Sequence, residues 1–111
     1  MLKNIYTFEE RCYSSHLILQ KYPDYIPIYL ESITSELLLK KNKYLCPCSF
    51  TFSQFICNIR ASLTLQSNKA LFIFINSTMP YGNQLMYDIY EKDKDMDGFL
   101  YMVISYEHTF G

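Results

Sequence analysis

Two uninterrupted apolar runs constrain the fold of this 111-residue chain more than any other feature. Leu71–Ile75 reads Leu-Phe-Ile-Phe-Ile, and Phe99–Ile104 reads Phe-Leu-Tyr-Met-Val-Ile. Short runs of this kind, rich in β-branched and aromatic residues, are typical of central strands that are covered on both faces. The sequence therefore predicts that both segments are inner strands of one sheet.

Two capping boxes mark where helices begin. In Thr7–Glu10 and in Thr51–Gln54, a threonine stands three residues before a side chain that can reach back to it, so each pair can satisfy free backbone donors of a first helical turn. The first helix is expected over about Phe8–Lys21, because the residue before Pro23 is pushed out of the helical region. The second helix has one apolar face suited to packing on a sheet: Phe52, Phe55, Ile56, Ile59 and Leu63.

Two further segments read as strands, and each contains a proline. Tyr25–Ile33 and Tyr44–Cys48 are rich in strand-forming residues, with Pro27 in the first and Pro47 in the second. Proline cannot donate a ladder hydrogen bond, so both strands are expected at an edge or an irregularity of the sheet. Such an edge leaves backbone groups open to a binding partner.

The complete element order predicts an α+β fold. A short helix is expected between the two apolar runs, with Asn83 as its cap and with apolar positions at Leu85, Met86, Ile89 and Tyr90. The order is then helix, strand, strand, helix, strand, short helix, strand. Its simplest assembly is a β-grasp arrangement, in which a helix crosses one face of a four-stranded mixed sheet, with an additional leading helix.

Charge and composition limit the classes of function. Ten Lys plus Arg against 11 Asp plus Glu give a formal net charge of -1, which lacks the basic footprint of a nucleic-acid binder. No run of about 18 apolar residues occurs, and the N-terminus lacks the apolar core of a signal peptide, so the cytoplasm is the expected compartment. The length predicts one core, which excludes an enzyme with separate substrate and cofactor lobes.

The candidate metal and catalytic groups form no convincing constellation. Asp93–Gly98 resembles the first half of a calcium-binding EF-hand loop, but position 12 of that loop, which requires a bidentate Glu, is Ile104. No metal and no cofactor is expected. The alternative of a thiol or metal enzyme would use His16 with Cys46, Cys48 or Cys57, yet these cysteines and Cys12 lack zinc-site spacing and are read as small apolar residues.

Ordered fragments from about Phe8 to the last residue resemble the autophagy ubiquitin-like modifiers related to GABARAP and microtubule-associated protein light chain 3. The fragments are Lys21–Asp24, Ile26–Pro27, Lys43–Leu45, Pro47, Thr51, Gln54–Phe55, Ile59–Arg60, Ala70–Asn76, Met79–Pro80, Phe99–Tyr101 and Phe110–Gly111. The resemblance implies a ubiquitin-like β-grasp domain over residues 25–107. It also implies an N-terminal helical extension over residues 1–24 and a flexible conjugation tail over residues 108–111.

The resemblance implies a protein tag that other enzymes attach to a lipid. In that family an activating enzyme adenylates the C-terminal glycine, a conjugating enzyme carries it as a thioester, and an amide bond joins it to phosphatidylethanolamine. Gly111 is the expected conjugation site. Because glycine has no side chain, its carbonyl is open to an attacking thiolate or amine. The lipidated form is expected on the autophagosome membrane.

The resemblance further implies that the protein binds short extended motifs with an aromatic residue and, three positions on, an aliphatic one. The peptide would add to the edge strand near Lys43 to Cys46, between two pockets. The aromatic pocket is expected at Ile18, Pro27, Tyr29, Lys43, Leu45 and Phe99. The aliphatic pocket is expected at Tyr44, Cys46, Pro47, Phe50 and Phe55. Recognition by the processing and delipidating cysteine protease is expected at Phe72, Phe74 and Phe110.

Three positions depart from the family pattern and leave ligand preference open. Tyr25 and Ser62 stand where the family usually has basic residues, and Asn58 stands at a usually aliphatic rim of the second pocket. An alternative reading keeps the pockets without lipidation. The chain would then be a non-conjugated peptide-binding adaptor of the same fold.

Overall fold

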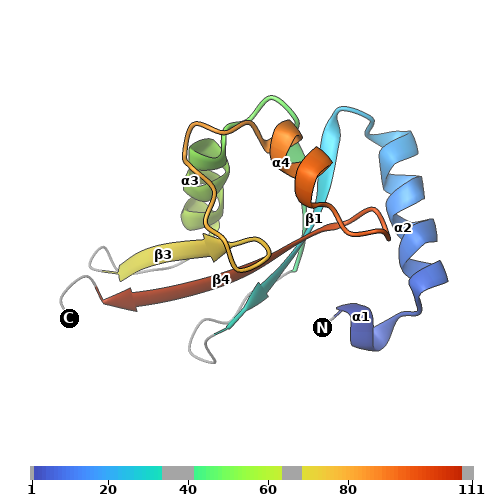
Figure 1. The fold of residues 1–111 in the computed structure, drawn as a ribbon, viewed down its shortest axis with the longest axis horizontal. Coiled ribbons are helices and arrows are strands. Elements are labelled where there is room, and N and C mark those ends of the chain that lie inside the picture. Colours follow the sequence, from blue (N-terminus) through green and yellow to red (C-terminus); the bar gives the residue numbers. More distant parts are fainter. Residues whose placement is uncertain (1, 34–41, 64–68, 109–111) are drawn as a thin grey trace.

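The computed structural model of the chain describes residues 2–33, 42–63 and 69–108. Within these ranges the elements follow in the predicted order, preceded by a short helix that the sequence did not indicate (Figure 1). The elements are α1 (Leu2–Ile5), α2 (Phe8–Lys21), β1 (Tyr25–Ser32), β2 (Lys43–Pro47), α3 (Phe52–Ser62), β3 (Lys69–Phe74), α4 (Met86–Asp93) and β4 (Leu100–His108). The α+β order is therefore confirmed.

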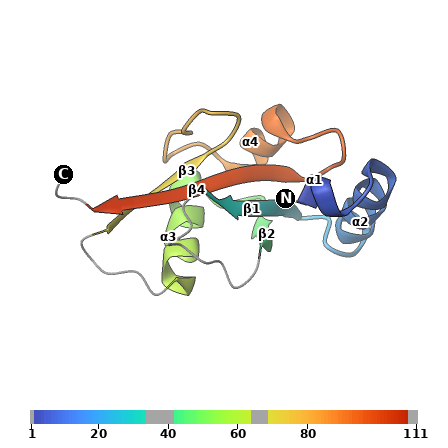
Figure 2. The same cartoon turned by 90° about the horizontal axis from the view of Figure 1, so that it is seen from below.

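The four strands form one mixed sheet in the spatial order β2-β1-β4-β3. The central strands β1 and β4 run parallel, whereas β2 and β3 pair antiparallel with their neighbours. This arrangement confirms the predicted four-stranded mixed sheet. In both views the far end of β4 lies at the opposite end of the molecule from α1 and α2 (Figures 1 and 2).

Helices cover both faces of the centre of the sheet. Alternate residues of β1, such as Ile28, join α3 and α4 in the main core, whereas Tyr29 packs with Phe99 and with Ile18 of α2 on the other face. Since α2 covers one side and α3 with α4 the other, five consecutive residues of β1 are buried. None of the helices among the described residues is long and apolar enough to cross a membrane.

The two apolar runs turn out to occupy different places in the sheet. The prediction of a central strand is correct for β4, which pairs with both β1 and β3, but wrong for β3, which is an edge strand. Ile73 is buried in the core, while Phe72 and Phe74 alternate to the other face and are only half-buried. An apolar run therefore shows that a strand is apolar on both faces, but not how many neighbours it has.

The proline of β1 lies in a central strand, contrary to the expectation of an edge. The Leu30 N–H donates to the Asn42 carbonyl at 2.8 Å, and the Cys48 N–H donates to the Asp24 carbonyl at 2.9 Å. Even-numbered residues of β1 therefore face β2, and Pro27 faces β4. Because pairing with β4 begins only at Ile28, the missing donor of Pro27 interrupts no ladder. The expectation of an edge is correct for β2.

Both predicted capping boxes are present. In each, the threonine hydroxyl accepts a hydrogen bond from the amide three residues on, and the Glu10 or Gln54 side chain accepts the threonine N–H at 2.8 Å. The cap predicted at Asn83 is wrong, because α4 begins at Met86, whose N–H donates to the Phe50 carbonyl. A distant backbone group thus satisfies the donor that a local side chain was expected to satisfy.

Candidate functional site

The outer edge of β2 presents free backbone groups. Since the even-numbered residues of β2 bond to β1, the N–H and C=O groups of Lys43 and Leu45 point away from the sheet. Pro47 ends this edge without an N–H. Within the described residues no other strand pairs with β2 on this side, so an extended peptide has a two-residue template for main-chain hydrogen bonds.

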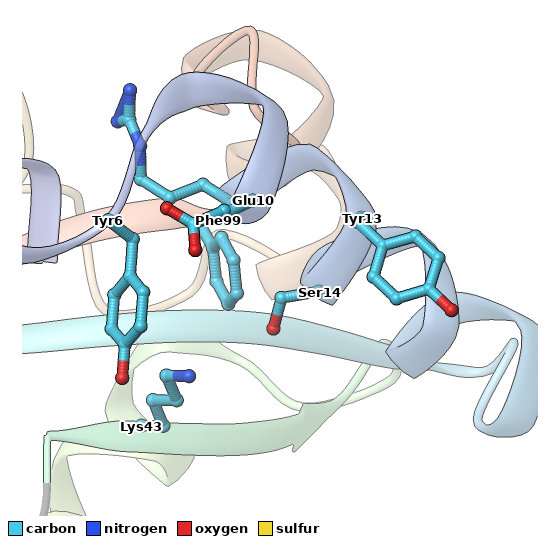
Figure 3. Close-up of a pocket in the computed structure, with 7 residues that line it drawn as sticks. Tyr6, Glu10, Tyr13, Ser14, Lys43 and Phe99 are labelled. Carbon is cyan, nitrogen blue, oxygen red and sulfur yellow. The ribbon is translucent and has the colours of Figure 1, made fainter.

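A hollow of about 290 Å³ lies on the α2 side of this edge. Its walls are Tyr6, Glu10, Arg11, Tyr13, Ser14, Lys43 and Phe99, and Figure 3 shows the Tyr6 side chain reaching down beside Lys43. Of the residues expected in the aromatic pocket, Lys43 and Phe99 line this hollow. Ile18 and Tyr29 pack around Phe99, so the structure brings four of the six expected residues together.

The remaining two residues of the expected aromatic pocket do not line this hollow. Pro27 is buried within β1. Leu45 is 41% exposed on the edge strand and lines a different hollow, between β2 and α3. The register nevertheless pairs Pro27 with Leu45 next to the Tyr29–Lys43 pair, so all four residues lie on the α2 face of the sheet.

Most of this first hollow is built by N-terminal residues that the sequence interpretation missed. Glu10, Ser14 and Ile18 are spaced four residues apart and therefore lie on one face of α2. Given Ile18 as a pocket residue, this spacing is a signal that could have identified Glu10 and Ser14. No local signal pointed to Tyr6, which comes from the turn between α1 and α2.

The walls of the hollow combine two cations, Arg11 and Lys43, with one carboxylate, Glu10, and an aromatic floor. The Lys43 ammonium lies 5.7 Å from the ring centroid of Tyr6 and 6.0 Å from that of Phe99, within cation–π range. Hydrogen bonds from the backbone and the side chain of Thr7 lower the pKa of Glu10, so this carboxylate is charged at neutral pH. Burial raises the pKa of Tyr29 behind the floor. Such a site suits an aromatic side chain whose polar edge meets charged walls.

On the α3 side of the edge, the expected aliphatic pocket is divided into two hollows. One of about 180 Å³ is lined by Tyr44, Leu45, Cys46, Phe55, Asn58, Ile59 and Ser62. The other, of about 450 Å³, is lined by Phe50, Ser53, Gln54, Cys57 and Asn58. Four of the five expected residues thus line one hollow or the other, while Pro47 lines neither. Asn58 borders both, so an amide stands between two apolar surfaces.

The cysteines and histidine that could serve an enzyme are not brought together. Cys46 is buried in the core under α3, whereas His16 is exposed on α2 at the other face of the sheet. Burial raises the pKa of Cys46 to about 12, so its thiol is neutral and forms an apolar wall. Across residues 2–33, 42–63 and 69–108, no group of three or more potential metal ligands is found.

The comparison with known families decides the identity of the fold. A family model described as autophagy protein Atg8, ubiquitin like, matches residues 10–111. The chain belongs to the Atg8 family. This confirms the resemblance to the autophagy modifiers, the ubiquitin-like β-grasp fold and a role in autophagy.

Relatives of this Atg8 protein match over nearly their full length. Autophagy-related protein 8D of Oryza sativa subsp. japonica is 44% identical over 112 residues, covering 98% of this chain and 95% of the relative. Autophagy-related protein 8 of Mycosarcoma maydis is 44% identical over 111 residues, covering 98% and 94%.

Solved structures of Atg8 proteins also superpose closely. Trypanosoma brucei ATG8 has a TM-score of 0.89 at 38% identity, covering 99% of this chain and 97% of that one. Plasmodium falciparum Atg8, solved in complex with a Plasmodium falciparum Atg3 peptide, has a TM-score of 0.84 at 33% identity, covering 95% and 94%.

The residues expected to meet the conjugation and processing enzymes are described only in part. Phe72 and Phe74 lie half-buried on the edge strand β3 of this Atg8 protein. Strand β4 runs through His108, the first residue of the expected tail. Phe110 and Gly111 lie outside the described residues.

Proposed function

We propose that this Atg8 protein is attached through Gly111 to phosphatidylethanolamine and recruits cargo receptors and adaptors to autophagosomal membranes. The free protein is cytoplasmic, and it is the substrate of its conjugation enzymes rather than a catalyst. The observation that carries the proposal is the free edge of β2 with a hollow on each side, in a chain that matches the Atg8 family through residue 111.

The geometry of the edge supports a preference for aromatic-x-x-aliphatic motifs. Side chains of an extended peptide alternate between faces, so residues three positions apart point to opposite faces and lie about 10 Å apart. The two hollows lie on opposite faces of the sheet edge, one beside α2 and one beside α3. A peptide strand bonded to Lys43 and Leu45 can therefore place its aromatic residue in the first and its aliphatic residue in the second.

The proposed partners fall into two classes. Motif-bearing receptors and adaptors would use the edge of β2, and the peptide seated on the Plasmodium relative makes a segment of the conjugating enzyme another candidate for that edge. The activating enzyme, the conjugating enzyme and the delipidating cysteine protease would act on the C-terminal tail. Phe72, Phe74 and Phe110 would meet the protease.

Conjugation is tested with the activating enzyme, the conjugating enzyme, ATP and liposomes that contain phosphatidylethanolamine. We expect a mobility shift of the wild-type chain and none for Gly111→Ala. Liposomes of phosphatidylcholine alone are the control. A wild-type chain that stays unshifted and off the membrane overturns the conjugation half of the proposal. It favours the non-conjugated adaptor if motif peptides still bind.

Peptide binding is tested with a Trp-x-x-Leu peptide and two single replacements, Ala-x-x-Leu and Trp-x-x-Ala. Each replacement should weaken binding, because each empties one hollow. A Trp-x-Leu peptide of the same composition is the matched control, since its two side chains point to the same face. Equal affinity for the two spacings would contradict the two-faced edge as the recognition site.

A further inference from the structure

The aromatic hollow is assembled from two parts of the chain that are far apart in sequence. Five of its seven lining residues belong to the N-terminal segment Tyr6–Ser14, and only Lys43 and Phe99 belong to the ubiquitin-like domain. Figure 1 shows α2 at one side of the molecule, apart from α3 and α4, which cover the main core. The hollow therefore exists only while the N-terminal segment lies against the domain.

One buried aspartate joins the two parts. The fully buried Asp97 carboxylate accepts the Tyr101 hydroxyl at 2.5 Å and the Phe99 N–H at 2.9 Å, and it lies 3.3 Å from the guanidinium of Arg11 on α2. The Asp97 carbonyl also accepts the hydroxyl of Ser15 on α2 at 2.5 Å. Two contacts to α2 therefore depend on this residue.

The same loop also holds α1. The Lys3 ammonium donates to Asp95 at 2.7 Å and lies 4.7 Å above the ring of Tyr101. Asp95 in turn accepts the Asp97 N–H at 3.0 Å. The loop Asp95–Gly98, called the clamp loop below, thus bonds to both N-terminal helices.

The clamp loop lies close against α2. Gly98 has a φ of +95°, and a Cβ at this position would collide with the Ser15 hydroxyl. Its carbonyl accepts the Tyr90 hydroxyl of α4 at 2.7 Å, which fixes the loop to the domain. The loop is therefore held on one side by the domain and on the other by the N-terminal helices.

We propose that the clamp loop sets the ligand affinity of the aromatic hollow by holding its N-terminal wall in place. Asp97, Tyr101 and Lys3 are positioning residues, because none of them lines the hollow. The inference rests on the proposed function, since it concerns the binding of the aromatic residue of the motif. An apparent dissociation constant scales inversely with the fraction of molecules that are competent to bind, so release of the wall weakens binding without removing a contact.

The test measures two properties of the same variants. The first is the dissociation constant for Trp-x-x-Leu and for Ala-x-x-Leu peptides. The second is amide hydrogen exchange along α2, which reports release of the N-terminal wall without any ligand. For Asp97→Asn we expect faster exchange in α2. If the N-terminal wall stays in place in only about one tenth of the molecules, affinity for Trp-x-x-Leu should fall about tenfold. Affinity for Ala-x-x-Leu should not change.

Two milder variants keep the inference testable if Asp97→Asn unfolds the protein. Tyr101→Phe removes one hydrogen bond to Asp97 and keeps the ring, and Lys3→Gln removes the ion pair to Asp95, so both should show smaller changes in the same direction. Glu91→Gln is the control, because it breaks the Glu91–Lys94 ion pair on α4, away from the hollow. It should change neither the exchange in α2 nor the affinity for either peptide.

The outcomes separate this inference from the function on which it rests. A wild-type chain that binds neither peptide overturns the proposed recognition function and, with it, this inference. If the wild type binds, faster α2 exchange in Asp97→Asn with unchanged Trp-x-x-Leu affinity overturns the clamp alone. Equal weakening for both peptides also overturns it, because the effect is then not confined to the aromatic hollow.

Discussion

The two hollows beside β2 are held together by different forces. The hollow on the α3 side has three walls in the main core, Cys46, Phe55 and Ile59, which are no more than 3% exposed. The hollow on the α2 side has walls with Tyr6 at 44% and Tyr13 at 65% exposure. Its N-terminal wall is fixed largely by the polar contacts of the clamp loop.

This difference teaches that one binding edge can combine a rigid half with an adjustable half. Apolar burial responds mainly to changes of volume, whereas buried charge pairs respond to the loss of a partner or a charge. Changes in the core should therefore act on the aliphatic side and on global stability. Changes in the clamp loop should act on the aromatic side.

The largest effect is expected for Phe55→Ala. This ring is 3% exposed and lines the smaller aliphatic hollow, so its removal should lower the free energy of unfolding by about 3–5 kcal/mol. Urea denaturation followed by circular dichroism measures the loss. Phe72→Ala on β3 is the matched control, and its smaller cost follows from its half-buried ring. Similar losses for the two variants would contradict the assignment of Phe55 to the rigid core.

Gly98→Ala should strain the backbone of the clamp loop. A positive φ at a residue with a side chain costs about 1–3 kcal/mol, and the added Cβ would also collide with Ser15. We expect lower stability in urea and faster exchange in α2. In a Ser15→Ala background the collision with the hydroxyl is removed while the close approach to the residue 15 Cβ and the φ strain stay, so part of the loss should return. No recovery in that background would show that the loop is not pressed against α2.

The local signals of the sequence predicted most of the framework. Capping boxes at Thr7 and Thr51 and the proline after α2 are encoded within a few residues, and they located the helices correctly. Errors arose where the outcome depends on distant neighbours. The place of β3 at the edge and the capping of α4 by the Phe50 carbonyl are decided by tertiary pairing, which a local pattern does not contain.

The candidate site shows the same division between local and long-range information. The resemblance correctly predicted Lys43 and Phe99 in one pocket, but it did not identify Tyr6 as another wall of that hollow. In the sequence, Asp97 stood out only within Asp93–Gly98, the segment that resembles the first half of an EF-hand loop. Its role depends on Arg11, which lies 86 residues away in the chain, so only the folded structure relates the two.

Acidic pH should loosen the N-terminal wall on the aromatic side of the edge. Partial burial raises the pKa of Asp95, but the hydrogen bonds from Lys3 and from the Asp97 N–H outweigh it, so the folded pKa lies below the ordinary value of 3.8. The stabilisation by this charge is therefore complete above pH 3.8 and falls as the pH drops through the lower folded pKa. Hydrogen exchange in α2, measured between pH 6 and pH 3 and corrected for its intrinsic rate, should show release of the wall at the acid end.

Lys3→Gln provides the control for the acid effect. Without the ammonium partner, the Asp95 carboxylate loses part of its preference for the charged form, so less stabilisation remains to be lost in acid. The acid-dependent increase of exchange should therefore be smaller in this variant. An increase equal to that of the wild type would assign the effect to another carboxylate, such as Glu10, whose pKa is also lowered.

The smallest effect is expected for Asn58→Leu on the rigid half. Asn58 is exposed and borders both hollows on the α3 side, so a leucine there would extend their apolar walls into one surface. Burying an additional part of an aliphatic side chain against a ligand leucine contributes about 1 kcal/mol, or about fivefold in affinity for Trp-x-x-Leu. Trp-x-x-Ala should gain less, because it leaves these hollows empty. An equal gain for both peptides would show that residue 58 does not contact the aliphatic position of the motif.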